Sequence, residues 1–154
     1  MNIPTPIFPP PPISRPGPDD FDEVLQVWED SVRATHHFLV EADIQVFRTL
    51  VPQLLEVVDL YCTRDEAGRI SGFLGIADGK IEMLFMRSDQ RGKGIGKALT
   101  RFALDELKIR KVDVNEQNMQ ALGFYRHAGF VVVDRSATDG LGKPYPILHM
   151  EYPG

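Results

Sequence analysis

Residues 81–99 constrain the fold more than any other stretch, because they combine a strand pattern, a glycine-rich turn and a helix pattern in direct succession. The apolar run at 81–86 predicts a buried strand, and the stripe formed by Ile95, Ala98, Leu99 and Phe102 predicts an amphipathic helix. Three glycines between positions 92 and 96 lie in the turn that joins them. This order is typical of a layered α/β domain.

The start of the helix after this turn is suited to an anion. The first backbone N–H groups of a helix have no internal partner, and the helix dipole places partial positive charge there. Arg91, Lys93 and Lys97 add three positive charges to a chain whose net charge is −5. We therefore expect a phosphate group at this turn, the plain alternative being a strand-to-helix connection without a ligand.

Two common phosphate-binding loops do not match the residues present. A Walker loop that ends at Lys97 needs glycine at position 91 and serine or threonine at position 98, where the chain has Arg91 and Ala98. A dinucleotide-binding fingerprint that begins at Gly92 or Gly94 needs a third glycine at position 97 or 99, and neither position holds one. Both of these classes are therefore excluded.

The remaining pattern predicts one domain preceded by a proline-rich arm. Eight of the 12 prolines lie in the first 18 residues, so we expect a flexible arm over 1–12 and a folded domain over 13–154. A chain of 154 residues is long enough for one domain that buries about 70% of its unfolded surface. The domain should be a mixed α/β sheet protein.

Local signals place the expected elements along the chain. A short strand at 13–15 precedes two helices, over 21–32 and 47–58, and Asp20 with Glu23 has the spacing of a capping box. Strands follow at 60–63, 70–77 and 81–86, and Asp78-Gly79 predicts a type I′ hairpin turn. After the glycine-rich turn and its helix we expect a strand at 112–114, a helix that ends at Gly129, and strands at 130–133 and 147–152.

The charge balance, the cysteine content and the apolar runs indicate which partners and which location to expect. Seventeen Lys and Arg against 22 Asp and Glu argue against a nucleic-acid backbone as the partner and suit a basic or neutral substrate. The single cysteine, Cys62, cannot form an internal disulfide, so the cytoplasm is the expected location. The chain has neither a signal-peptide pattern nor an apolar run near 18 residues, so we expect no membrane association.

A second motif begins about 20 residues after the glycine-rich turn. Its letters are NMQALGFYRHAGF at 118–130, and those of the turn are RGKGIG at 91–96. Together the two motifs resemble the cofactor-binding motifs of the GCN-related N-acetyltransferases, the GNAT superfamily. The segments ATH at 34–36, VNEQN at 114–118 and LGKPYP at 141–146 are similar to its bacterial YjaB-type members. The resemblance covers about residues 13–152.

This resemblance implies a fold, a cofactor and a set of binding residues. The fold would be a sheet of six or seven strands, splayed between the fourth and fifth and flanked by about four helices. Acetyl-CoA would lie in the split as co-substrate, and no metal is implied. The turn would hold the pyrophosphate, the fourth strand the pantetheine, and Tyr125 would face the sulfur. The implied cofactor-binding residues are Leu84, Phe85, Met86, Arg91, Gly92, Lys93, Gly94, Ile95, Gly96, Lys97, Asn118 and Tyr125.

Acetyl transfer to an amine requires a base. A lysine-like amine with a pKa of about 10.4 is roughly 3.4 units from its neutral form at pH 7, which corresponds to about 4.6 kcal/mol. The candidates are Glu82, on the same face of its strand as Leu84, and Asp113, on the strand at 112–114. His36 and His37 are a third choice, because the resemblance puts them beside the acceptor. The plain alternatives are solvated carboxylates and surface histidines.

Tyr125 is the candidate acid. A leaving thiolate with a pKa of about 8.5 and a tyrosine near 10 make complete proton transfer unfavourable by only about 2 kcal/mol. Without the resemblance, Tyr125 would instead be interpreted as a core aromatic on the stripe of Ala121 and Ala128. A free backbone N–H of Phe85 or Met86 would stabilise the oxyanion.

The leading hypothesis is therefore an N-acetyltransferase that moves acetyl from acetyl-CoA to a primary amine in a ternary complex. The alternatives are a non-catalytic acyl-CoA-binding or sensing module, and a subunit recruited to an assembly through the proline-rich arm. The acceptor stays open between a small amine and a protein lysine, and the chain is expected to be a monomer or a homodimer.

Overall fold

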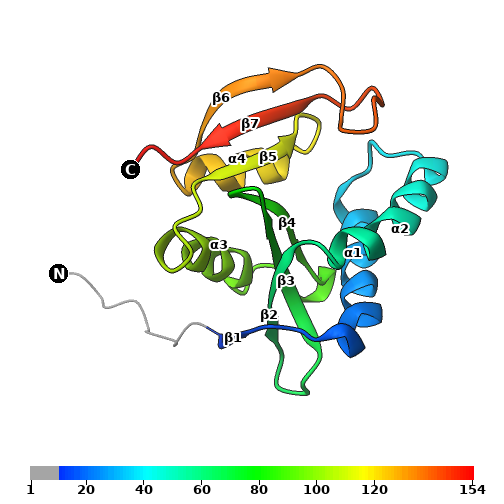
Figure 1. The fold of residues 1–154 in the computed structure, drawn as a ribbon, viewed down its shortest axis with the longest axis vertical. Coiled ribbons are helices and arrows are strands. Elements are labelled where there is room, and N and C mark those ends of the chain that lie inside the picture. Colours follow the sequence, from blue (N-terminus) through cyan, green and yellow to red (C-terminus); the bar gives the residue numbers. More distant parts are fainter. Residues whose placement is uncertain (1–10) are drawn as a thin grey trace.

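The computed structural model describes residues 11–154, which fold into one seven-stranded sheet flanked by helices (Figure 1). Of the predicted arm, residues 1–10 lie outside the described range, and Pro11 and Pro12 belong to no helix or strand. The elements in chain order are β1 (Ile13–Ser14), η1 (Pro18–Asp20), α1 (Phe21–Thr35), α2 (Glu41–Leu55), β2 (Asp59–Arg64), β3 (Ile70–Ala77), β4 (Lys80–Met86), η2 (Ser88–Gln90), α3 (Ile95–Asp105), β5 (Lys111–Asn115), α4 (Met119–His127), β6 (Val131–Ser136) and β7 (Ile147–Glu151).

The sheet divides between β4 and β5. Its strand order is β1-β2-β3-β4-β5-β7-β6, and all neighbours are antiparallel except β4 and β5, which are parallel. A single register pair, Ile81 with Val112, joins these two strands near their amino ends. Beyond this pair they diverge, which leaves an opening at their carboxyl ends. The predicted splay between the fourth and fifth strands is confirmed.

Two apolar cores lie on the two faces of the sheet. Figure 1 shows α1 and α2 on one side of β2–β4 and α3 on the other. The first core joins α1 and α2 to Phe73 and Met83, and the second joins α3 and α4 to Leu74 and Ile81. Phe73 and Leu74 are neighbours on β3 and therefore face opposite sides. Ile81 and Met83 are two positions apart on β4 and lie in different cores because the register of β3 against β4 shifts between them. The second core also contains Tyr125, so the site is built directly on it.

Two predicted turns are confirmed by their backbone angles. Asp78 and Gly79, between β3 and β4, have φ of 53° and 73°, as a type I′ turn requires at both central positions. Gly129, just after α4, has φ of 106°, which suits the glycine that follows a helix end. The hairpin fixes the register of β4, and the helix end returns the chain to the sheet as β6.

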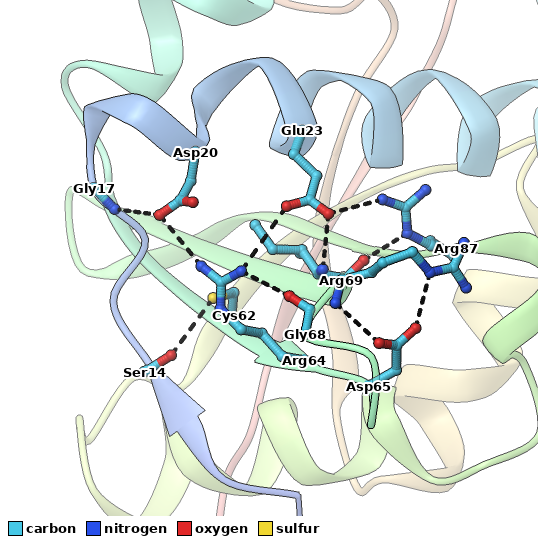
Figure 2. Close-up of polar contacts among 11 residues, drawn as sticks. Ser14, Gly17, Asp20, Glu23, Cys62, Arg64, Asp65, Gly68, Arg69 and Arg87 are labelled. Carbon is cyan, nitrogen blue, oxygen red and sulfur yellow. Dashed lines mark hydrogen bonds and ion pairs between the residues drawn. The ribbon is translucent and has the colours of Figure 1, made fainter.

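The capping box predicted for Asp20 and Glu23 is wrong. The chain enters α1 through the turn η1, so the Asp20 carboxylate accepts the Gly17 N–H at 2.9 Å, one turn earlier than expected. Figure 2 shows Glu23 directed from α1 toward Arg64 and Arg87. It accepts the Ile70 N–H at 3.0 Å and pairs with Arg87 at 3.2 Å, which ties α1 to both ends of the β3–β4 hairpin.

Within residues 11–154, no helix is long and apolar enough to cross a membrane. The same range contains no group of three or more His, Cys, Asp or Glu side chains with the arrangement of a metal site.

Candidate functional site

A cavity of about 370 Å³ opens where β4 and β5 diverge, walled also by α3, α4 and the end of α1. All three predicted catalytic residues line it, namely Glu82, Asp113 and Tyr125. Every predicted cofactor-binding residue lines it except Lys93. His36 also lines the cavity, whereas His37 is exposed and lies outside its wall. The two sequence motifs therefore meet in one site.

The glycine-rich turn forms the end of the cavity at α3. Gly92 and Gly94 have φ of 76° and 80°, a left-handed conformation that glycine adopts without strain. The backbone N–H groups of residues 91–97 donate to no acceptor in the part of the chain that the structure describes. Consecutive free N–H groups at a helix start form a cradle for an anion. The turn therefore fits a pyrophosphate.

The third glycine of the turn allows close packing. A Cβ atom added to Gly96 would lie 3.1 Å from Cε of Met86 and 3.4 Å from Cε1 of Phe124, so a side chain there would push α3 away from β4 and α4. Arg91 Nη1 donates to Oε1 of Gln120 at 3.1 Å, which links the turn to α4. The turn is therefore held at a fixed distance from both strand and helix.

The carboxyl half of β4 has one unpaired edge. Leu84, Phe85 and Met86 pair with β3, but β4 has no partner in β5 after Ile81. The N–H and C=O groups that face the split are therefore free to pair with an extended chain that carries amides, as in the addition of a strand to a sheet. Such an edge fits the amide-containing arm of the expected cofactor.

A chain of hydrogen bonds crosses the mouth of the cavity from α1 to α4. Thr35 Oγ1 donates to the Ser31 carbonyl at 2.7 Å, so it accepts from Nδ1 of His36 at 2.7 Å. Asn118 Oδ1 accepts the Ala121 N–H at 3.1 Å as the N-cap of α4, so its Nδ2 donates to Nε2 of His36 at 3.3 Å. With these directions, every hydrogen bond of the series has one donor and one acceptor.

These bonds require a neutral His36 with its proton on Nδ1. Burial lowers the pKa of His36 to about 4, and the charge of Arg91 acts in the same direction. At neutral pH the Nε2 lone pair is already used by Asn118. His36 therefore acts here as a fixed link between the two halves of the site, with no free atom to accept a substrate proton.

Tyr125 lies inside the second core with one end in the cavity. Its ring packs edge-on against Phe124 and Phe130, with centroids 5.1 and 5.4 Å away, and its exposed fraction is 5%. The hydroxyl has no hydrogen-bond partner among residues 11–154. Burial raises the pKa of Tyr125, so the phenol stays protonated and can donate a hydrogen bond to a group in the cavity.

Glu82 occupies a β-bulge. Gly75 pairs with Met83 and Ile76 with Ile81, so Glu82 has no partner in β3. Its side chain is 27% exposed, and burial raises the pKa of this carboxyl. The Lys80 ammonium, 4.0 Å from Oε1, opposes the rise only in part. A partly desolvated carboxylate with a raised pKa is suited to accept a proton.

Asp113 is held more tightly than Glu82, the other carboxylate candidate. Lys80 Nζ donates to its Oδ2 at 2.7 Å, and His149 Nδ1 lies 2.6 Å from its Oδ1. His149 Nε2 in turn meets Oγ of Ser136 at 2.7 Å. Burial alone would raise the pKa of Asp113, but the hydrogen bonds from Lys80 and His149 outweigh it and lower the pKa. Asp113 is therefore a weaker base than Glu82.

Sequence reasoning missed Lys80, His149 and Ser136. Strand pairing brings them to Asp113: His149 lies opposite it on β7, Ser136 lies opposite Ile147 on the next strand, and Lys80 adjoins the Ile81–Val112 pair of β4 and β5. The only signal in the sequence is that Asp113 and His149 each interrupt an apolar strand. Which strands are neighbours, and in what register, is decided by the folded sheet.

A second cavity of about 640 Å³ lies on the α1–α2 side of β4. Its wall comes from α1, α2 and the loop between β6 and β7. Four residues line both cavities, namely His36, Glu82, Met83 and Phe85. The two cavities therefore meet at β4, with the Glu82 carboxylate at their common wall.

Comparison with known proteins shows the family to which this chain belongs. A family model described as an acetyltransferase (GNAT) domain matches residues 34–142, which is more than half of the chain. The chain belongs to the GNAT acetyltransferase family. As a GNAT acetyltransferase it is an acyl-CoA-dependent enzyme with acetyl-CoA as co-substrate, and the expected family and cofactor are confirmed.

Two curated relatives span almost the whole of this GNAT acetyltransferase. The peptidyl-lysine N-acetyltransferase YjaB of Salmonella typhimurium strain LT2 is 38% identical over 141 residues, or 92% of this chain and 97% of that protein. YjaB of Escherichia coli strain K12 is 37% identical over 142 residues, with the same coverage of 92% and 97%. The chain is thus similar to these enzymes along its length.

Solved structures agree. The solution structure of apo-form YjaB from E. coli superposes with a TM-score of 0.85 at 37% identity, covering 93% of this chain and 97% of that one. The PaiA N-acetyltransferase of Thermoplasma acidophilum, solved in complex with coenzyme A, has a TM-score of 0.68 at 21% identity, covering 92% and 98%. The latter shows the shared fold.

Proposed function

We propose that this enzyme acetylates the side-chain amine of lysine in peptides or proteins, by direct transfer within a ternary complex in the cytoplasm. The observation that carries the proposal is the junction of two cavities at β4, where Glu82 lines both. One cavity fits the cofactor and the other is open to an acceptor. Two relatives at 37–38% identity, named peptidyl-lysine N-acetyltransferases, support the choice of lysine.

In this proposal the first cavity binds acetyl-CoA. The free N–H groups of residues 91–97 hold the pyrophosphate, with Arg91, Lys93 and Lys97 adding positive charge. The open edge of β4 over 84–86 pairs with the pantetheine amides. Asn118, held by His36 and by its N-cap bond, positions α4 beside the cofactor arm.

We propose Glu82 as the general base that deprotonates the acceptor lysine. Acetyl-CoA supplies the thioester whose carbonyl carbon forms the new bond to the amine nitrogen. The ammonium of lysine must first lose a proton, at a cost of about 4.6 kcal/mol at pH 7. Glu82 accepts this proton, directly or through one water, because it faces both cavities and its pKa is raised. Asp113 holds Lys80 and His149 in place.

Tyr125 assists the departure of the thiolate. As the carbon–sulfur bond breaks, the Tyr125 hydroxyl donates a hydrogen bond toward the sulfur. Because burial raises the pKa of Tyr125, stabilisation by this hydrogen bond is favoured over complete proton transfer. Backbone N–H groups at Phe85 or Met86, on the unpaired edge of β4, stabilise the negative charge that develops on the carbonyl oxygen.

The test is thiol release from acetyl-CoA with a lysine peptide, against the same peptide with arginine in place of lysine. Both peptides carry a blocked N-terminus, so the lysine side chain is the only difference in acceptor. We expect thiol release and an acetylated product with the lysine peptide alone. Stabilisation by acetyl-CoA without product from any peptide or small amine would instead establish a binding or sensing module.

A further inference from the structure

The second cavity is strongly apolar. At about 640 Å³ it is large enough for a drug-sized ligand, well beyond the aliphatic stem of one lysine. Most of its wall is aliphatic or aromatic, and its lining contains no Lys or Arg. Among the apolar lining residues are Trp28, Phe47, Leu54, Val57, Phe85 and Leu141.

The rim of this cavity exposes large apolar side chains to solvent. Leu54, Val57 and Leu141 have exposed fractions of 37%, 74% and 52%. Single exposed apolar residues are common, but a cluster of them around a cavity is typical of a binding surface. The continuity of the rim with the acetyl-transfer site, through the shared residues of β4, indicates that the acceptor is what covers it.

The loop over the cavity is fixed in place. Asp43 of α2 accepts hydrogen bonds from Tyr145 Oη and, at 2.8 Å, from Lys143 Nζ. Asp139 Oδ1 accepts the backbone N–H groups of Leu141 and Lys143, both at 2.9 Å. These bonds hold Leu141 across from α2, so the apolar groove is formed before any acceptor binds.

The charge of the groove complements an ammonium group. Its charged lining residues are Glu82 and Asp139, both acidic. Glu82 lies at the wall shared with the first cavity, where the reacting nitrogen must arrive. An acceptor that fits has a cationic amine at the Glu82 end and a bulky apolar body along α2 and the loop.

We propose that this groove binds the residue beside the target lysine, and that the enzyme prefers a lysine flanked by a large apolar residue such as Phe or Leu. This preference rests on the proposed lysine acetylation. The lysine side chain reaches Glu82, while the neighbouring apolar side chain fills the groove between Leu54, Phe47 and Leu141.

The test compares kcat/KM for three blocked peptides that differ at one position. One has glycine on both sides of the lysine, one has Phe before it and one has Phe after it. We expect one of the Phe peptides to exceed the glycine peptide by about tenfold or more, which is the order of discrimination that apolar pockets provide. The gain should appear mainly as a lower KM.

A matched pair of variants links the preference to the groove. Leu54→Ser removes an apolar rim residue, whereas Val46→Ser changes a residue of the same helix with a similar exposed fraction, 41% against 37%, that does not line the groove. Leu54→Ser should abolish most of the advantage of the Phe peptide and change kcat/KM for the glycine peptide by much less, because glycine has no side chain to contact position 54. Val46→Ser should leave the rates with both peptides unchanged.

The outcomes separate the preference from the function. Equal kcat/KM for all three peptides, or an advantage of the Phe peptide that survives Leu54→Ser, overturns the preference while lysine acetylation stands. Acetylation of phenethylamine with no acetylation of any peptide overturns the peptide acceptor itself. A tenfold preference lost only in Leu54→Ser supports the proposal.

Discussion

Replacing Glu82 with glutamine tests the proposed base without changing the size of the side chain. Glutamine cannot accept the proton of the acceptor ammonium, so the variant must wait for the small fraction of lysine that is already neutral. At pH 7 that fraction is set by a gap of roughly 3.4 units, or about 4.6 kcal/mol. A positioned base typically contributes a factor of about 10² to 10⁴. We therefore expect Glu82→Gln to lower kcat/KM by about 100-fold at pH 7.

The pH dependence of the rate tests the role of Glu82 more stringently than its value at pH 7. The neutral fraction of lysine rises about tenfold per pH unit up to its pKa of about 10.4. The rate of Glu82→Gln should rise with it, whereas the wild-type rate should level off once Glu82 is ionised. Because burial raises the pKa of Glu82, we expect that levelling above the usual range of a glutamate. Between pH 7 and 9 the rate of Glu82→Gln should therefore rise by about 100-fold, so it should approach the wild-type rate near pH 9.

The assay is steady-state thiol release with a lysine peptide between pH 6 and 9, at saturating acetyl-CoA. Asp113→Asn is the matched control, since it removes a carboxylate from the same cavity that also contacts Lys80. Its ratio to the wild type should not change with pH in the same way. A loss below about threefold in Glu82→Gln, or a loss that stays constant from pH 7 to 9, would refute the role of Glu82.

Three further predictions concern the rest of the site. Tyr125→Phe should lower the single-turnover rate constant of transfer at least tenfold and leave the Kd for acetyl-CoA unchanged, and an unchanged rate constant would exclude its role as hydrogen-bond donor to the sulfur. Asn118→Ala removes the N-cap of α4 and should reduce the free energy of unfolding by about 1 kcal/mol in urea titrations, and no change would show that the cap bond is unimportant. The pKa of His36 is about 4 in the folded chain and about 6.5 in the unfolded chain, so between these pH values only the unfolded chain binds this proton. The free energy of unfolding should therefore fall as the pH drops from 6.5 to 4, by up to about 3 kcal/mol. Urea titrations of the wild type and His36→Gln at pH 7 and 5 should show a larger loss in the wild type, and equal losses would contradict the assignment.

Much of the fold was predictable because its signals are local. The type I′ turn at Asp78-Gly79 and the glycine after α4 depend only on backbone angles that few residues adopt. The glycine-rich turn was predictable for the same reason, and the resemblance added the position of the split. Alternation along the strand at 112–114 was enough to place Asp113 on the opposite face from its apolar neighbours.

The contacts that decide the roles of the acidic residues were not predictable, because they depend on pairing between distant strands. The bulge at Glu82 appears only in the register of β3 against β4. The bonds that weaken Asp113 as a base come from Lys80 and from His149, 36 positions away on β7. Likewise Asp20 and Glu23 have a capping-box spacing, but their carboxylates make other contacts. Asp20 binds the Gly17 N–H in the turn η1 and pairs with Arg64, and Glu23 pairs with Arg87.

The most direct test of acetyl transfer to lysine is a single-turnover reaction with acetyl-CoA labelled in its acetyl carbons and a blocked lysine peptide. Tandem mass spectrometry then locates the label. We expect the label on the lysine Nε atom, with transfer slowed in Tyr125→Phe and Glu82→Gln. Label that stays on coenzyme A, or appears only as free acetate, while the protein is stabilised by acetyl-CoA, would contradict direct acetyl transfer to lysine.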